Sequence, residues 1–367
     1  MAGGPAPVDW SVAEKVAVAV ARRQAPEVDR RTREALESDF AEMTGEAEGL
    51  VSEATGLKSL AGPARAEVTD RAGWIRANLA SFRRLLTPLL ERHHDENKTS
   101  LTARLPEPLQ KATRAAAGAE LGALLGWMSS RVLGQYDLLL TEDADSEGDV
   151  VYFVGPNVVQ LERRHGFASD EFRLWIAIHE LTHRAQFTGV EWMRPHFLSL
   201  VDRAVSAAAP DSKAMAAALK KMAAEIAQGR NPIAENGLIG VFASPEQQDA
   251  LRSAQALMSL LEGHGDIVMN TAGAARVPGA GRFSSTLQRR RESTSGVSKL
   301  LQQLIGLDAK MRQYKDGEHF VESVEAAGGP ALFRLVWEEA SYLPTLEEIR
   351  EPQRWIDRVG GRSLQSA

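Results

Sequence analysis

The residues best suited to chemistry are two histidines and a glutamate in the sequence HELTH. His179 and His183 are four residues apart, so on an α-helix they differ by about 40 degrees around the axis and project side by side. Glu180 lies about 100 degrees round from His179, within reach of a water on a shared ion but outside its ligand set. The spacing predicts that the imidazoles bind one zinc ion and that Glu180 acts on its water as a general base.

A third protein ligand is expected, because a catalytic zinc ion usually has three and leaves its fourth position to water. The best candidate is Glu262 in LLEGHGDIVMN, since Asp266, four residues on, shares its helical face. We expect Glu262 to bind the metal and Asp266 to accept the free imidazole N–H of His179 or His183. A solvated helix face is the competing interpretation, but the apolar residues around both acids favour a buried position.

Several other residues are weaker candidates. His264 is two residues from Glu262 and about 200 degrees away on a regular helix, so it is only a reserve ligand. Gln186, three residues beyond His183, either contacts the site or substrate from outside the ligand set or packs the helix end. Stabilisation of an oxyanion needs a further donor. The segment KMRQYKDGEHF offers three, each of which could instead lie at a solvated helix end: Arg312, Tyr314 and His319.

Helices are the elements expected to position these side chains. The run FRLWIAIHELTHRAQF follows SDEF, so a helix should begin at Ser169 with acids in its first turn. A second long helix should carry Glu262, because Ser244 can cap it, Pro245 suits its first position and Glu246 its first turn. Apolar spacing predicts further long helices at 74–92 and 109–132.

One region departs from this helical pattern. The apolar runs YDLLL at 136–140 and VVYFV at 150–154 flank a polar stretch rich in turn formers, which predicts a β-hairpin. The fold class is therefore mainly α, with a small hairpin or sheet beside the active-site helix. The glycine-rich residues 271–285 are expected to form a mobile loop. We expect one compact unit with the following regions: a flexible start at 1–10, a helical region at 11–135, a catalytic region at 136–350 and a charged tail at 351–367.

Composition excludes several classes of function. The 367 residues include no cysteine, so thiolate zinc sites, disulfides and cysteine nucleophiles are excluded, and histidine and carboxylate must hold any metal. A formal net charge of -6 is unlike the basic surface of a nucleic-acid or membrane partner. Neither a secretory signal nor a run of about eighteen apolar residues is found, so we expect a cytoplasmic protein. Nothing in the pattern indicates an oligomeric state.

The segments HELTHRAQF, LLEGHGDIVMN and KMRQYKDGEHF together resemble a bacterial family of zincin-like metallopeptidases, which is assigned to the hydrolases without an established substrate. The VDW near the start resembles a branch associated by gene context with deazaflavin coenzyme biosynthesis, and the similarity extends to LPTLEEIREPQRWIDRV. The resemblance implies a zincin-like fold. The E-x-x-x-D spacing is also similar to the glutamate-zincin pattern, which implies Glu262 as third ligand and Asp266 behind it. No histidine follows His183 at the spacing of three-histidine zincins, so their ligand set does not apply.

The leading functional hypothesis is zinc-dependent hydrolysis of a peptide bond, with the hairpin at 136–154 presenting an edge strand to an extended substrate. A zinc-stabilised binding or scaffold protein without turnover is a second hypothesis. A third is hydrolysis of an amide in a small coenzyme-related molecule. Glu180 favours an enzyme, because a purely structural zinc site gains nothing from a general base.

Overall fold

The computed structural model describes residues 8–23, 26–92, 106–137, 149–205, 244–292 and 307–361. The chain forms two compact units, the first made of Met1–Ala185 with Ala272–Phe283 and the second of Gln186–Thr271 with Ser284–Ala367. Most of the expected flexible start, residues 1–7, lies outside the described residues. None of the helices within the described ranges has the length and apolar character needed to cross a membrane.

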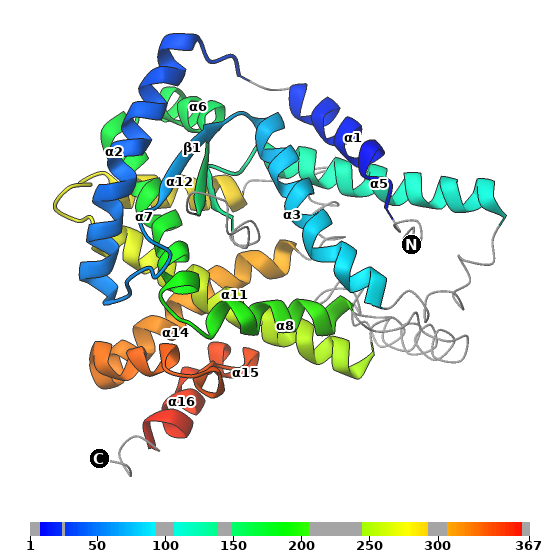
Figure 1. The fold of residues 1–367 in the computed structure, drawn as a ribbon. Coiled ribbons are helices and arrows are strands. Elements are labelled where there is room, and N and C mark those ends of the chain that lie inside the picture. The colour runs from blue at the N-terminus through cyan, green and yellow to red at the C-terminus, as the bar shows by residue number, and fades with distance from the viewer. Residues whose placement is uncertain are drawn as a thin grey trace. The chain divides into compact units, whose positions relative to one another are not determined.

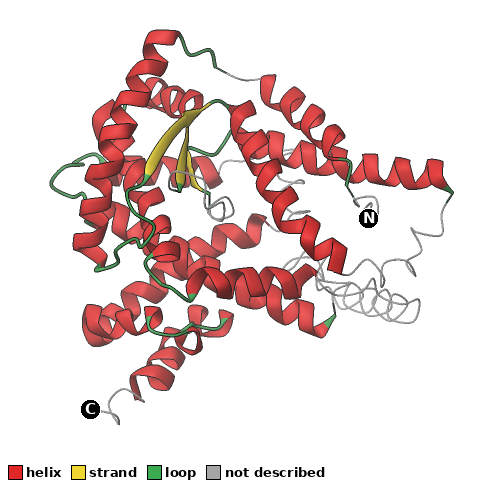
Figure 2. Ribbon diagram, in the orientation of Figure 1, coloured by secondary structure: helices red, strands yellow, loops and turns green. Residues whose placement is uncertain are grey.

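The first unit is a set of helices around a small sheet (Figure 1). Its helices are α1 (Trp10–Arg22), α2 (Arg30–Thr55), α3 (Arg71–Arg92), α5 (Glu107–Ser129), α6 (Gly155–His165) and most of α7 (Ser169–Thr188). Its strands are β1 (Arg65–Thr69), β2 (Gly134–Tyr136) and β3 (Val150–Val154). Figure 2 shows how small the sheet is beside the helices. The predicted mainly α fold with a small sheet is confirmed.

The sheet has the strand order β1-β3-β2, with β1 parallel and β2 antiparallel to the central strand β3. Every residue of β3 is buried, and Phe153 stacks on Phe40 of α2 with ring centroids 3.9 Å apart. The predicted second hairpin strand is confirmed. The predicted first strand, 136–140, overlaps β2 only at Tyr136, where β2 ends, and residues 138–140 of that prediction lie outside the described residues. The antiparallel pairing of β2 with β3 is the pairing that a hairpin requires. Strand β1 was not predicted.

Helix α5 leads the chain into β2. A methyl group on Gly118 or Gly122 would come within 2.4 Å of a backbone oxygen, that of Asp9 before α1 or of Ala13 within it, so α5 packs closely on α1. Past the end of α5, the buried Asn157 of α6 donates from Nδ2 to the carbonyls of residues 129 and 132, each at 2.7 Å. These bonds fix the path of the chain immediately before β2.

The second unit holds α8 (Met193–Val205), α11 (Pro245–Thr271), most of α12 (Ala280–Glu292), α14 (Leu307–Arg334), α15 (Leu346–Arg350) and α16 (Pro352–Trp355). Helix α11 begins where predicted, because the Ser244 hydroxyl accepts from the N–H of Gln247 while the Gln247 side chain accepts from the N–H of Ser244. The predicted loop at 271–285 is partly wrong, since α12 begins at Ala280. The N–H of Gly279, one residue earlier, donates to Glu171 at 2.7 Å.

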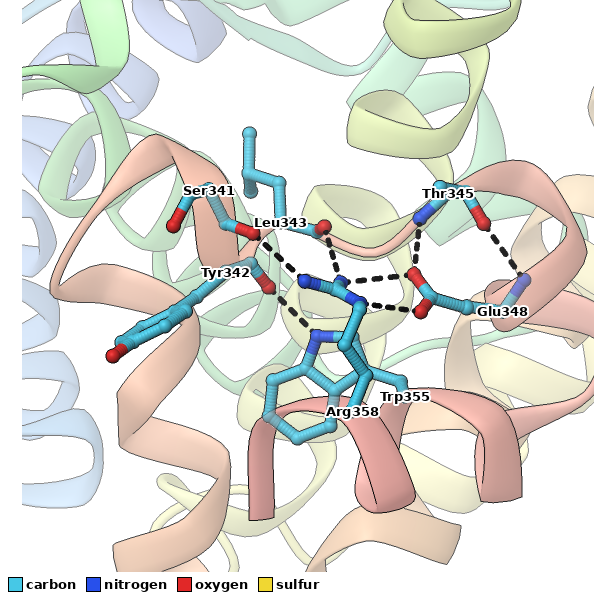
Figure 3. Close-up of polar contacts among 7 residues, drawn as sticks. All are labelled: Ser341, Tyr342, Leu343, Thr345, Glu348, Trp355 and Arg358. Carbon is cyan, nitrogen blue, oxygen red and sulfur yellow. Dashed lines mark hydrogen bonds and ion pairs between the residues drawn. The ribbon is translucent and has the colours of Figure 1, made fainter. Parts of the chain in front are cut away.

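The C-terminal segment of the second unit is organised around Arg358 (Figure 3). Its guanidinium donates to both carboxylate oxygens of Glu348, at 2.6 and 2.9 Å, and to the carbonyls of Ser341 and Leu343. Trp355 is fully buried, and its indole N–H donates to the carbonyl of residue 342 at 2.7 Å. Residues from the predicted tail are therefore packed against the preceding 3-10 turns and α15.

Candidate metal centre

Helix α7 carries the predicted metal-binding sequence. Between Phe172 and Phe187 every residue is buried except His179 and His183, which are partly exposed. Their Nε2 atoms are 3.2 Å apart, with ring centroids at 4.5 Å and ring planes nearly perpendicular. The helix therefore presents two imidazole nitrogens at one place on an otherwise buried surface, as the four-residue spacing predicts.

The separation of these nitrogens fits zinc. With Zn–N distances of about 2.0–2.1 Å and tetrahedral angles, two nitrogen ligands should lie about 3.3–3.4 Å apart. The observed 3.2 Å is close to that value, and it also suits a hydrogen bond in which one neutral ring donates to the other. The two imidazole nitrogens are thus compatible with a tetrahedrally coordinated cation. Because the sequence has no cysteine, any remaining protein ligand must be a histidine or a carboxylate.

Glu180 is buried against the edge of the sheet. Its side chain is 7% exposed, and its Oε2 accepts from the backbone N–H of Tyr136 at 3.2 Å. A Cβ at Gly134 would lie 2.6 Å from the Glu180 Cγ and 2.8 Å from its Oε1, so a larger residue there would displace the carboxylate. Strand β2 therefore determines where Glu180 sits, a dependence that the sequence analysis missed.

Two buried arginines hold α7 on either side of His179. Arg173 donates to both carboxylate oxygens of Glu162, at 2.8 and 3.0 Å, and to Asp39. Such paired geometry gives strong, oriented hydrogen bonds. The sequence analysis did not identify these pairs, although an arginine inside an apolar helix is itself a signal that a buried acid lies nearby.

The second of these arginines, Arg184, is 1% exposed. Its Nε is 2.9 Å from each carboxylate oxygen of Asp149, the residue before β3, and its guanidinium also reaches Glu48 at 2.5 Å and the carbonyl of Gly62. Burial alone would lower the pKa of Arg184, but hydrogen bonds and charge from Asp149 and Glu48 raise it above its ordinary value. The arginine therefore stays charged and ties α7 to the start of the central strand.

In the second unit, α11 presents Glu262 from a buried turn. Residues 259–266 are buried except Glu262, which is partly exposed, and Asp266 is 5% exposed. This turn crosses α14 at two glycines, where a Cβ on Gly263 would lie 2.2 Å from the backbone of Gly317 and one on Gly317 would lie 1.9 Å from the carbonyl oxygen of Ser259. The turn of α11 that carries Glu262 and Asp266 therefore packs directly against the backbone of α14.

Gln186 and His264 also meet in the second unit. The Gln186 Nε2 is 3.1 Å from the carbonyl oxygen of Leu261 and 2.9 Å from the Nδ1 of His264. The His264 ring packs against Phe333 and Trp337, with centroids 5.3 and 5.2 Å away. Gln186 is fully buried and His264 is 5% exposed, so His264 is part of a packed core.

The three expected oxyanion donors all lie in α14. His319 is exposed, whereas the side chains of Arg312 and Tyr314 lie outside the described part of that helix. Their contribution stays a prediction. Among the described residues, Tyr136 and Gly134 are the functional neighbours of Glu180 that sequence reasoning missed, and Gly134 carried a usable signal, because a glycine in a strand often marks a close approach.

Helix α7 carries paired imidazoles and an adjacent buried glutamate, an arrangement typical of metallopeptidases. The family model for zincin-like metallopeptidases matches residues 8–356, so the chain belongs to the family of zincin-like metallopeptidases. A crystal structure from Chloroflexus aurantiacus, described as that of a proposed hydrolase with a novel fold, is 30% identical and has a TM-score of 0.67. That match covers 96% of this chain and 98% of the other. The comparison with curated proteins gave no match.

These similarities confirm the predicted zincin-like family, and both support a hydrolase.

Proposed function

We propose that the protein is a zinc-dependent peptidase in which His179, His183 and Glu262 bind the metal and Glu180 is the general base. The observation that carries the proposal is the pair of Nε2 atoms 3.2 Å apart on the helix that also holds the buried Glu180. Membership in the zincin-like metallopeptidase family supports the same chemistry.

Glu262 is the proposed third ligand. Like the two histidines it is partly exposed, and its carboxylate oxygens are of a kind that binds zinc. The chain itself supplies further support, because α7 continues from His183 to Gln186 and the Gln186 amide bonds to Leu261, the residue before Glu262. Asp266, one turn further along α11 and 5% exposed, remains the proposed acceptor for an imidazole N–H.

When bound, zinc would lower the pKa of a water molecule and polarise the carbonyl of the scissile bond. Glu180 takes a proton from the attacking water and returns it to the leaving amine. The N–H of Tyr136 holds the Glu180 carboxylate in one orientation, and the absence of a side chain at Gly134 leaves room for it. His179 and His183, which lie on the same helix as Glu180, would hold the metal beside that carboxylate.

A peptide is the proposed substrate because β2 lies at the end of the strand order and contacts the general base through its own backbone. An extended chain that pairs with an edge strand is held by main-chain hydrogen bonds, so its scissile bond can be placed with little dependence on side chains. A small amide would not use this pairing. Activity on short amides with none on peptides would therefore favour the small-molecule hypothesis.

The experiment compares the purified wild type with the Glu180→Gln variant for zinc content and for cleavage of a peptide library. Glutamine keeps an acceptor for the Tyr136 N–H but is a very weak base, so we expect zinc to be retained and cleavage to fall by about 10²–10⁴-fold. Wild-type protein that contains no transition metal and takes up none would refute the proposal. Stoichiometric zinc with no cleavage of peptides or amides by either protein would favour the scaffold hypothesis.

Two finer expectations stay predictions. The VDW near the start is the basis for a link to the branch associated with deazaflavin coenzyme biosynthesis, and a cytoplasmic location is the second expectation. Activity on amides related to that coenzyme would test the first, and localisation of the tagged full-length protein would test the second.

A further inference from the structure

We propose that Gln186 is a positioning residue, whose amide fixes the α11 turn that carries Glu262 to the helix that carries His179 and His183. The inference rests on the proposed function, because it concerns the assembly of the same ligand set. It assigns to one buried side chain the task of joining two ligand-bearing helices that are far apart in sequence.

Helix α7 runs without a break through His179, His183 and Gln186. Gln186 follows His183 by three residues in an unbroken helix, so it lies about 4.5 Å further along the axis on nearly the same face. A side chain at this position is rigidly related to both imidazoles by the helix backbone. A group that binds Gln186 is therefore held at a fixed position relative to the two histidines.

The orientation of the Gln186 amide follows from its two partners. A backbone carbonyl only accepts, so the Gln186 atom 3.1 Å from the Leu261 oxygen must be the nitrogen. The second hydrogen on this nitrogen points to the Nδ1 of His264 at 2.9 Å. Nδ1 must then be an acceptor, and a neutral His264 must carry its proton on Nε2. The two bonds together specify one tautomer of His264.

The turn of α11 that Gln186 holds is restrained on several sides. Leu261 and His264 lie on either side of Glu262, so the amide bonds the turn before and after the proposed ligand. The same turn lies against the backbone of α14 at Gly263, and the His264 ring packs against Phe333 and Trp337. A turn restrained on these sides moves as one piece. If loss of the Gln186 bonds shifts this turn, Glu262 therefore shifts together with it.

The experiment uses the full chain and two variants. Gln186→Met keeps a similar volume and removes both donors, whereas Gln186→Glu keeps the shape and only accepts. We expect zinc affinity, measured by competition with a chelating dye, to fall about 10–100-fold in the Gln186→Met protein, the range found when groups that orient metal ligands are removed. Proton–nitrogen NMR spectra of the imidazole rings should show the Nε2–H tautomer of His264 in the metal-free wild type and Nδ1–H in the Gln186→Glu protein.

Gln247→Met is the matched control. Gln247 is also a glutamine of the second unit that donates to a backbone carbonyl, that of Ala204 at 3.1 Å, and it lies at the start of α11, far from Glu262. We expect this variant to lose thermal stability in the metal-free state, as Gln186→Met does, with its zinc affinity unchanged. A general loss of packing would weaken zinc binding in both.

The outcomes separate the two proposals. Wild type that binds zinc, together with a Gln186→Met variant that binds it equally tightly, overturns the positioning role alone, as does an Nδ1–H tautomer in the wild type. Wild type that binds no zinc overturns the proposed function and the positioning role with it. Should Gln186→Met not fold, Gln186→Glu takes its place, and unchanged zinc affinity in that variant overturns the inference.

Discussion

Each unit of the molecule contains an arginine that is surrounded by acceptors, and the two arginines differ mainly in burial. Arg184 on α7 is 1% exposed, while Arg358 in the C-terminal segment is 30% exposed at its side chain. Both bond to the two oxygens of one carboxylate and to backbone carbonyl oxygens, as Figure 3 shows for Arg358. Similar hydrogen bonding therefore operates in two different dielectric surroundings, with Arg184 also reaching a second carboxylate, that of Glu48.

The difference shows what each arginine contributes. A fully buried ion pair carries a large desolvation penalty, so its net benefit is small while both partners are present, but removal of one leaves an uncompensated buried charge. When the arginine of a pair is partly exposed, as Arg358 is at 30%, water can enter the space it leaves and solvate the remaining carboxylate. We infer that Arg184 specifies the position of α7, whereas Arg358 adds modest stability to a segment that already packs around Trp355.

The largest expected effect is that of Arg184→Met. The variant leaves the Asp149 carboxylate, which is 1% exposed, without its main cation, so the free energy of unfolding should fall by about 3–5 kcal/mol. Urea denaturation of the metal-free protein measures this. The control is Arg276→Met in the same unit, which removes a pair with Glu46 whose arginine is 62% exposed and should cost at most about 1 kcal/mol. Equal losses in the two variants would contradict the comparison.

A smaller loss is expected for Arg358→Met. The variant removes hydrogen bonds to one carboxylate and to the carbonyls of Ser341 and Leu343. Solvent can enter where the partly exposed guanidinium lay, although the Glu348 side chain itself is only 9% exposed. Hydrogen bonds to charged groups contribute about 1.5–3 kcal/mol, so the free energy of unfolding should fall by about that amount or less. The same urea measurement applies. A loss larger than that of Arg184→Met would show that burial does not govern the difference.

The parts of the fold that the sequence predicted are those set by short-range pattern. His179 and His183 are one helical turn apart, and the Ser244 cap is completed three residues later, so both features follow from local geometry. Strand β1 was missed because it pairs with β3, more than eighty residues further along the chain, and its sequence RAEVT shows little apolar character. The ion pair of Arg184 with Asp149 is equally non-local.

The candidate site shows the same division. The proposed general base and the imidazole pair come from one helix and could be predicted from spacing, whereas the dependence of Glu180 on Gly134 and Tyr136 requires the pairing of distant elements. The crossing of Gly263 with Gly317 is a further example. Glycine inside a helix costs about 1 kcal/mol relative to alanine, so Gly263 in LEGHG and Gly317 in KDGEH indicate close helix packing, but not which helices meet.

The smallest effect, and the finest test of the comparison, is the pH dependence of the C-terminal segment. Burial raises the pKa of Glu348, but hydrogen bonds from Arg358 and Thr345 outweigh it and hold the pKa below its ordinary value. A carboxyl whose pKa is depressed by folding stabilises the native state above its unfolded pKa of about 4.5, and this contribution disappears as the pH falls through the folded pKa.

The stability difference between wild type and Glu348→Gln should therefore be fully present at neutral pH and should vanish in acid. Urea denaturation of the metal-free proteins between about pH 7 and pH 3 measures it, and metal is removed because zinc binding itself depends on pH. Glu351→Gln is the control, since its pair with Arg354 is 60% exposed on both sides and the profile should follow that of wild type. A difference that grows as the pH falls would mean that folding raises the pKa of Glu348, and the partly exposed Arg358 would then not be the partner that stabilises its charge.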